Sequence, residues 1–126
     1  MNFNQRQNVG ELNIEAIKRL TGIELPSAQV WMYPGLIKHV KKRHPGIMEQ
    51  YGHFISEIIS NPDYVGKNPS EPGSIELIKY VSPYLLLAVK LDPSGYVFIS
   101  SFYELNNGSV KVQKRLANGR LKPFSI

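Results

Sequence analysis

The sequence contains no cysteine. This absence excludes disulfide bonds, thiolate metal sites and cysteine nucleophiles. No run of about eighteen apolar residues occurs, so no transmembrane helix is predicted, and the first residues lack the apolar segment of a signal peptide. Glycine-rich phosphate loops, nucleophile elbows and zinc-type ligand spacings are absent too. We expect a soluble protein that needs no metal or other cofactor.

The length and composition are those of a globular chain. The sequence has 126 residues, of which 42% are hydrophobic and ten are glycine. A chain of this size can bury one hydrophobic core without added crosslinks but is short for two. No internal repeat or low-complexity tract interrupts it. We therefore expect residues 1–126 to form a single domain.

The net charge of +5 is concentrated in two short segments. Residues 37–56 carry four basic side chains and one acidic one, and residues 111–126 carry five basic ones and none acidic. Residues 1–36 sum to zero, and residues 57–110 carry three basic and six acidic groups. Two basic segments in a nearly neutral chain indicate a polyanionic partner, most commonly nucleic acid. The alternative is a pair of solvated helix faces.

Hydrophobic periodicity and turn residues predict an α+β fold. Helices are predicted over 11–21, 34–43, 50–60 and 109–118, the last one basic. Strands are predicted over 29–33, 64–67 (an edge strand), 75–81, 84–91 and 96–105. An N-terminal helical part, about 1–60, thus precedes an antiparallel meander and a final helix, about 61–126. We expect a mostly antiparallel sheet of about four strands.

The two turns between the late strands predict how these strands pair. If the turns are tight, Val81 faces Tyr84 and Leu91 faces Tyr96. One sheet face then carries the aliphatic and aromatic residues that the helices should cover: Ile78, Tyr80, Leu85, Leu87, Val89, Leu91, Phe98 and Phe102. The opposite face ends in the polar side chains Lys79, Tyr84, Ser101 and Tyr103. We predict a site at this end.

The segment HVKKRH, from His39 to His44, concentrates titratable side chains. Histidine exchanges protons near neutrality because its unperturbed pKa is about 6.5, and nearby cations favour the neutral ring. On a helix His39 shares a face with Arg43, whereas His44 lies about 140° from His39. The alternatives to catalysis are a surface histidine at position 39 and a core or capping histidine at position 44. His53 has no identifiable partner and is expected to be structural or at the surface.

These residue types suit metal-free cleavage of RNA. The 2′-hydroxyl of the substrate is the nucleophile, one imidazole removes its proton, and a second acid protonates the departing 5′-oxygen. Cations and hydroxyls stabilise the charge that develops on phosphorus-bound oxygen. DNA lacks the 2′-hydroxyl, so RNA is the expected substrate.

Four segments resemble one family of nucleases. They are HVKKRHP, ISEIISNPDYVGKNP, SIELIKYV and FISSFY, in a consistent order within residues 30–121. They are similar to the phage-associated barnase–EndoU–colicin–RelE-like (BECR) nuclease domains of phages and mobile elements. The resemblance implies a helical N-terminal part, a four-stranded antiparallel sheet and metal-independent endoribonuclease activity, often that of a toxin.

The resemblance also assigns residues. The helix histidines of the family match His39 and His44, the late-strand hydroxyl matches Ser101, and Lys79 and Tyr103 match by position and face. We expect His39 to act as general base or acid and His44 to be its complement or to orient it. Lys79 and Arg43 would stabilise phosphate, and Ser101 and Tyr103 would position it. The remaining predicted nucleic-acid contacts are Lys42, Lys111, Lys114 and Arg115. The predicted open face carries no strand carboxylate, which departs from a barnase-like glutamate base.

Two other functions remain open at this level. A non-catalytic RNA- or DNA-binding module would use the same basic segments, with salt-sensitive binding and no cleavage product. A phage or mobile-element protein could instead present its basic faces to an acidic partner such as an antitoxin or immunity protein. For the nuclease we expect an RNA substrate, no membrane association and action in the host cytoplasm.

Overall fold

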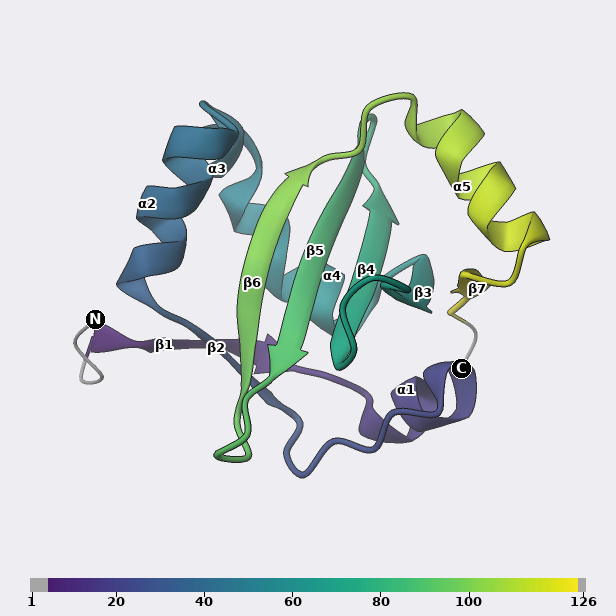
Figure 1. Cartoon of the computed structure of the whole chain (residues 1–126). Helices are drawn as coiled ribbons and strands as arrows, with labels where there is room; N and C mark the ends of the chain where they lie inside the picture. Colours follow the sequence, from purple (N-terminus) through teal and green to yellow (C-terminus); the bar gives the residue numbers. More distant parts are fainter. Residues whose placement is uncertain (1–4, 125–126) are drawn as a thin grey trace.

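The computed structural model describes residues 5–124, which form an α+β fold around one seven-stranded sheet (Figure 1). The strands, in their spatial order, are β1 (Gln7–Glu11), β2 (Gln29–Met32), β6 (Val97–Glu104), β5 (Tyr84–Leu91), β4 (Ser74–Tyr80), β3 (Tyr64–Lys67) and β7 (Leu121–Pro123). Neighbouring strands are antiparallel except β2 and β6, which are parallel. The predicted fold class is confirmed.

The helices begin and end at residues that favour these positions. They are α1 (Ile14–Thr21), α2 (Pro34–Arg43), α3 (Ile47–Tyr51), the 3-10 turn η2 (Gly52–Phe54), α4 (Ile55–Ser60) and α5 (Gly108–Ala117). The Asn13 side chain accepts a hydrogen bond from the Ala16 N–H at the start of α1, and Gly22 adopts φ +77° at its end. Pro34 opens α2 because its fixed φ suits the first turn.

Several details of the predicted architecture are wrong. The sheet of the described residues has seven strands rather than about four, because Gln7–Glu11 and Leu121–Pro123 pair at its two ends. The N-terminal part contains β1, which was not predicted, besides β2, which agrees with the strand predicted over 29–33. β3 is not an edge strand, because β7 pairs with it, and the basic helix α5 is therefore not the last element. The predicted helix over residues 50–60 is broken at Tyr51, with φ −128°, into α3, η2 and α4.

The predicted strand register slips by one residue between β4 and β5. Tyr80, rather than Val81, pairs with Tyr84, and Val81 donates its N–H to the Pro83 carbonyl within a three-residue loop. A two-residue type I′ turn needs positive φ at both central residues, which the ring of Pro83 forbids. The slip turns every side chain of β4 to the other face of the sheet.

The hairpin between β5 and β6 differs as well. Leu91 pairs with Val97 rather than Tyr96, and an irregularity at Ser100 shifts the register again, so that Ala88 pairs with Ser101. The two shifts together keep Ser101 and Tyr103 on the same face as Tyr84, as predicted, and move Phe98 onto that face. An extra residue in one strand reverses the alternation on one side of it.

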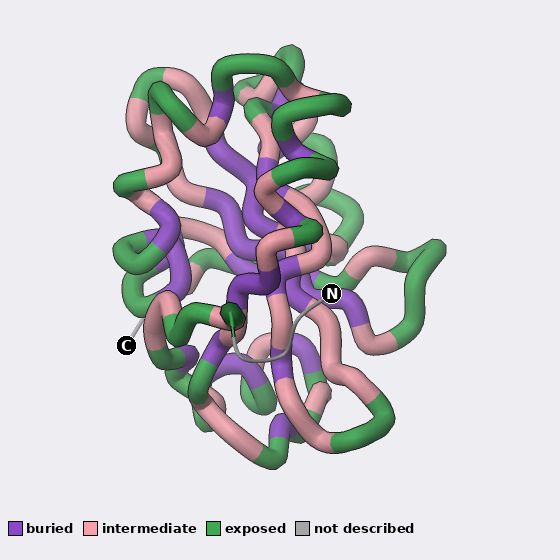
Figure 2. The backbone as a smooth tube through the Cα atoms, turned by 90° about the vertical axis from the view of Figure 1, so that its left-hand side faces the viewer, coloured by how far each residue is buried: buried purple, intermediate pink, exposed green. Residues whose placement is uncertain are grey.

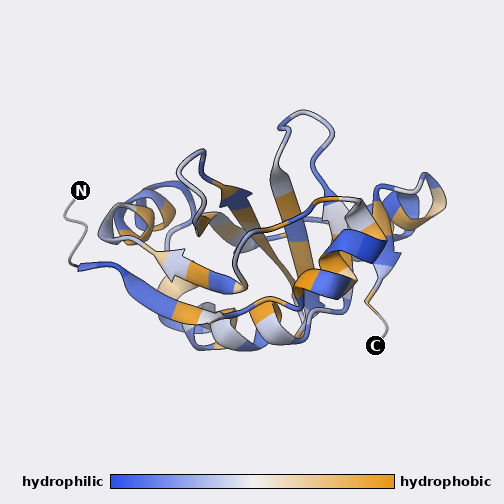
Figure 3. Ribbon diagram, turned by 90° about the horizontal axis from the view of Figure 1, so that it is seen from below, coloured by the Kyte–Doolittle hydropathy of each residue, from blue (hydrophilic) through white to orange (hydrophobic). Residues whose placement is uncertain are grey.

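Hydrophobic side chains pack on both faces of the sheet. The buried stretches of the chain gather in the middle of the molecule (Figure 2), and hydrophobic positions alternate with hydrophilic ones along the strands and helices (Figure 3). We call the face packed against α1, α2 and α4 the α4 face; its strand residues include Leu77, Leu87 and Phe102, all fully buried. The other face, the α5 face, has a smaller cluster around Ile78 and Leu86, which Val112 and Leu116 of α5 cover. Beyond α5 this face is only half-buried, as at Ala88, Ser101 and Tyr103.

The free edge of β6 is covered by helices. β2 pairs with β6 only at Val97 and Phe98. Beyond Phe98, α2 and α3 pack beside this edge of β6. Figure 1 shows α2 and α3 lying on one side of the sheet and α5 on the other. Within residues 5–124, no helix is long and apolar enough to cross a bilayer.

Candidate active site

The half-buried part of the α5 face lies between α2 and α5 (Figure 1). Glu76 of β4, Ala88 of β5 and Ser101 of β6 are paired neighbours across three strands, so their side chains point to the same side. Neighbouring strands are about 4.8 Å apart, which spaces Glu76 and Ser101 about 10 Å from each other. Functional side chains from both flanking helices can therefore reach a ligand on these strands.

His44 stands at the border between α2 and this face. It caps α2, because Pro45 disfavours continuation of the helix, and its N–H donates to the Val40 carbonyl at 2.7 Å. Its ring stacks on that of Tyr103, with centroids 5.1 Å apart and planes 22° apart. Burial, and then the charges of His39 and Arg43, lower the pKa of His44 from its ordinary value. A neutral imidazole at neutral pH can accept a proton.

Tyr103 joins His44 to the charged groups under α5. Burial, followed by the negative charge of Glu76, raises the pKa of Tyr103, whereas Arg115 and Arg120 act in the opposite direction. The phenol therefore keeps its proton near neutrality and can donate a hydrogen bond. One carboxylate and two guanidinium groups thus act electrostatically on the Tyr103 hydroxyl.

Glu76 and Arg120 form the best-defined ion pair of the site. The Glu76 side chain is only 3% exposed, and its carboxylate accepts two hydrogen bonds of 2.9 Å, from Nε and Nη2 of Arg120. A bidentate guanidinium–carboxylate pair satisfies both partners with fixed geometry. The predicted absence of a strand carboxylate from this face is thus wrong, and the cause is the one-residue slip of β4.

Sequence reasoning missed Glu76 because the register predicted for β4 was wrong by one residue, and it therefore gave Arg120 no partner. In the predicted register Glu76 shares a face with Ile78 on the helix-covered side, where a carboxylate has no evident use. The signal that could have identified it is the single charge within SIELI, a strand segment that is otherwise uncharged. Charged residues are almost never fully buried unless they are paired.

Arg115, a predicted nucleic-acid contact, is half-buried on α5. Its Nη1 atom is buried and has no hydrogen-bond partner among the described residues. A buried donor without a partner costs about 1–3 kcal/mol unless something fills its place. Together with its influence on Tyr103, this donor makes the area beside Tyr103 suited to an anion.

A hollow of about 400 Å³ opens beside the stacked pair of rings. Its lining residues come from α2, α3, the end of β6 and α5: His44, Pro45, Ile47, Gln50, Tyr51, Tyr103, Glu104, Leu105, Asn106 and Lys111. It combines aromatic rings with amide, carboxylate and ammonium groups. Flat rings with a polar rim are the usual surroundings of an unstacked nucleobase.

His39 lies one and a half turns before His44, on the exposed side of α2. It lines a separate hollow of about 280 Å³ together with Tyr33, Lys90, Phe98 and Ser100. The two histidines therefore line neighbouring hollows along the same border of the α5 face, and they interact through charge.

The predicted contacts with phosphate and backbone fall into three groups. Ser101 is half-buried on the α5 face, two residues from Tyr103. Lys111 lines the hollow beside His44. Lys42, Arg43 and Lys114 are exposed on α2 and α5, where they flank the site without contributing to its floor.

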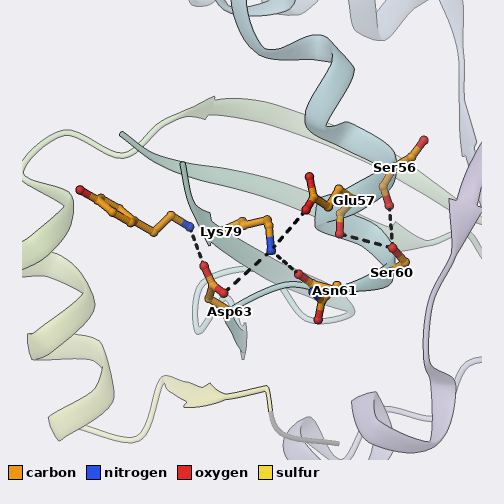
Figure 4. Close-up of polar contacts among 7 residues, drawn as sticks. Ser56, Glu57, Ser60, Asn61, Asp63 and Lys79 are labelled. Atoms are coloured by element: carbon orange, nitrogen blue, oxygen red, sulfur yellow. Dashed lines mark hydrogen bonds and ion pairs between the residues drawn. The ribbon is translucent and has the colours of Figure 1, made fainter. Parts of the chain in front are cut away.

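Lys79 does not join this group (Figure 4). It pairs with Leu85, which belongs to the α4 face, and its Nζ donates to the Asn61 carbonyl at 2.9 Å. The carboxylates of Glu57 and Asp63 each lie 3.9 Å from the same Nζ. The side chain is 12% exposed. It ties β4 to the end of α4 and lies on the face opposite the candidate site, so it does not fit the phosphate-stabilising role predicted for it.

Within residues 5–124, no group of three histidine, aspartate or glutamate side chains is arranged to hold a metal ion. Comparison with known families gave one finding: the family model described as phage-Barnase-EndoU-ColicinE5/D-RelE like nuclease3 matches residues 7–112. Comparisons with curated proteins and with solved structures gave no match.

Proposed function

This chain belongs to the phage-Barnase-EndoU-ColicinE5/D-RelE like nuclease family, and from that premise we propose that it is a metal-independent endoribonuclease. The observation that carries the proposal is the stacked pair of His44 and Tyr103 at the border of a sheet face flanked by half-buried guanidinium groups. A nuclease of this family cleaves phosphodiester bonds, and these groups can perform both proton transfers and stabilise the charge.

In the proposed reaction the ring of His44 removes the proton of the substrate 2′-hydroxyl. The 2′-oxygen attacks the adjacent phosphorus, and the bond from phosphorus to the 5′-oxygen breaks. The departing 5′-oxygen takes a proton from His39, which leaves a 2′,3′-cyclic phosphate and a 5′-hydroxyl. The lowered pKa of His44 suits the base, because the ring is neutral when substrate arrives.

The remaining groups act on the phosphate. The hydroxyl of Tyr103 is a donor that can bind a non-bridging oxygen, Ser101 can position the phosphate, and the half-buried guanidinium of Arg115 adds positive charge beside Tyr103. Glu76 has both carboxylate oxygens engaged by Arg120, so we assign it to positioning Arg120 rather than to proton transfer. Lys79 has no part in the proposal.

The test is cleavage of a 20-nucleotide RNA in EDTA. His44→Ala and His39→Ala should each reduce the cleavage rate by about 10²–10⁴-fold, the contribution of one proton-transfer group. Lys38→Ala, an exposed change on the same helix, is the matched control and should cleave like wild type. The product should carry a cyclic phosphate, and a substrate with 2′-deoxyribose throughout should stay intact. Cleavage of that DNA, or loss of activity in EDTA, would refute the mechanism.

A toxin-like role in the host cytoplasm, with an acidic antitoxin or immunity protein as inhibitor, completes the proposal. Its support is the excess of positive charge in residues 37–56 and 111–126, which flank the site from α2 and α5. Charge of one sign on both borders would steer an acidic protein as well as RNA. Expression of the wild-type chain should inhibit growth, and expression of His44→Ala should not. Co-expression of an acidic protein encoded by a neighbouring open reading frame should relieve the inhibition by wild type.

A further inference from the structure

A second group of basic side chains gathers beyond β7, away from the histidines. They line a hollow of about 370 Å³ and come from the end of α1, the end of β3 and the segment around β7: Lys18, Arg19, Lys67, Arg120 and Lys122. The other residues that line it are Leu20, Thr21 and three glycines, and none is acidic. Segments far apart in the sequence thus bring like charges to one place.

Only part of this charge is uncompensated, because Arg120 is paired with Glu76. Lys18 is paired with Glu24 at 2.7 Å and contributes little. Lys67 and Lys122, by contrast, are exposed and form no ion pair with another described residue. Uncompensated cations around a concave surface raise the local concentration of anions.

The backbone holds the two sides of this hollow close together. A Cβ atom at Gly66 would overlap the carbonyl of Arg120 and would lie 2.9 Å from the Leu121 Cδ2. Only glycine permits this approach of β3 to the chain before β7. Lys67, the next residue, is thereby fixed beside Arg120 and Lys122.

The hollow is connected to the candidate active site through Arg120. An adjoining hollow of about 610 Å³ is lined by Lys67, Pro69, Asn118, Gly119 and Arg120, three of which also line the first one. The Arg120 guanidinium reaches from there to Glu76 on the α5 face. Basic groups therefore continue from the α5 face around the end of the sheet.

We propose that these two hollows bind the sugar–phosphate backbone of single-stranded RNA on one side of the cleaved bond. The inference rests on the proposed ribonuclease function and extends it to a second, sequence-independent contact region. RNA fits better than a protein, because neither hollow has an aromatic side chain among its lining residues, whereas protein interfaces centre on such anchors. Lysine charges around an open hollow without aromatic side chains are typical of phosphate contacts.

The test uses RNA that cannot be cleaved, so that binding and cleavage are judged separately. A fluorescent 20-nucleotide RNA with 2′-O-methyl groups throughout is titrated with protein over a salt series and followed by anisotropy. Lys67→Gln/Lys122→Gln should weaken binding about 10-fold and reduce the slope of log affinity against log salt by about 1.4, because two phosphate contacts are lost. Lys38→Gln/Lys41→Gln removes the same charge from two exposed lysines that line neither hollow. It is the matched control for loss of long-range attraction, and it should change both quantities less than Lys67→Gln/Lys122→Gln.

Cleavage of a dinucleotide, which is too short to reach the hollows, should be the same for wild type and Lys67→Gln/Lys122→Gln. An unchanged salt slope in that variant would overturn the proposal. So would retained RNA binding combined with lost binding of polyglutamate, since the hollows would then serve an acidic protein. Binding of the RNA by wild type without any cleavage of ordinary RNA would contradict the proposed function alone.

Discussion

The position of His44 explains how one residue can both end a helix and take part in chemistry. As the cap of α2 it is held through its backbone, by the bond of its N–H to Val40, so its ring remains available to stack on Tyr103. Partial burial and two neighbouring cationic side chains then favour its neutral form. The local sequence RHP produces the placement, because proline prevents another helical turn.

This environment predicts the pH dependence of cleavage. A general base works only when unprotonated, so cleavage should rise with pH through the lowered pKa of His44, and the acidic limb should lie below the ordinary value of 6.5. Arg43→Gln removes one of the charges that lower this pKa. The limb should therefore move to higher pH in kcat/KM profiles.

Lys38→Gln, an exposed change on the same helix, is the control for charge removal in general. Its profile should coincide with that of wild type. A limb that stays in place in Arg43→Gln would mean that a group other than His44 is the base.

At the scale of elements, the sequence predicts where strands form better than how they pair. The helix over residues 34–43 has the predicted bounds, and β3, β5 and α5 agree closely with prediction. The short strands β1 and β7 escaped detection because they carry little periodicity and gain their stability from pairing at the two ends of the sheet. Tertiary contacts, which a local pattern does not contain, decide such segments.

For the candidate site too, the sequence predicts which residues take part better than how their strands pair. Both histidines, Ser101 and Tyr103 were predicted together, and the structure places them along or beside the α5 face. Lys79 and Glu76 each lie on the face opposite the predicted one, because the loop before β5 is one residue longer than predicted. Register depends on turn geometry, and an error of one residue reverses a whole strand.

The contact between β3 and β7 provides a prediction at this scale. Gly66→Ala would push its new methyl group into the backbone of Arg120, so we expect β7 to separate from β3 and the free energy of unfolding to fall by about 1–3 kcal/mol, the usual cost of overpacking. Gly52→Ala is the matched control. Its nearest atom, Met48 Cε, would lie 3.6 Å from the added methyl, so stability should be nearly unchanged.

Urea denaturation of both variants measures the difference. Equal midpoints for Gly66→Ala and wild type would show that β7 can shift without loss, and the close approach of β3 to residue 120 would lose its structural importance.

At the scale of the whole molecule, the pair of Glu76 and Arg120 joins segments 44 positions apart. It fastens the chain between α5 and β7 to the middle of the sheet, and with it the half-buried Arg115 on α5. The pair thus holds one border of the site at a fixed distance from the floor. α2, with its histidines, forms the other border.

Arg120→Ala tests this connection. The variant leaves the Glu76 carboxylate buried without its partner, and we expect a loss of about 3 kcal/mol, the lower end of the range for a broken buried pair because Arg120 is partly exposed. Replacement of both residues, as Glu76→Leu/Arg120→Met, should recover most of that loss. Lys122→Ala, which changes an exposed side chain two positions away, should alter stability by no more than about 0.5 kcal/mol.

Thermal and urea unfolding of these three variants give the comparison. A double variant no more stable than Arg120→Ala would indicate that the ion pair itself, rather than the avoidance of an isolated charge, stabilises the fold.

The helix α2 also shields the edge of β6 that β2 leaves unpaired. An uncovered strand edge can recruit the edge of another molecule and start aggregation. Selection on this helix therefore acts twice: Leu36 and Val40 hold it on the sheet, while its outward positions other than His39 and Arg43 are free to vary with the substrate. Diversification of such a nuclease is easiest on the outer surface of α2, and variants that loosen its inner surface should reveal themselves first as insoluble protein.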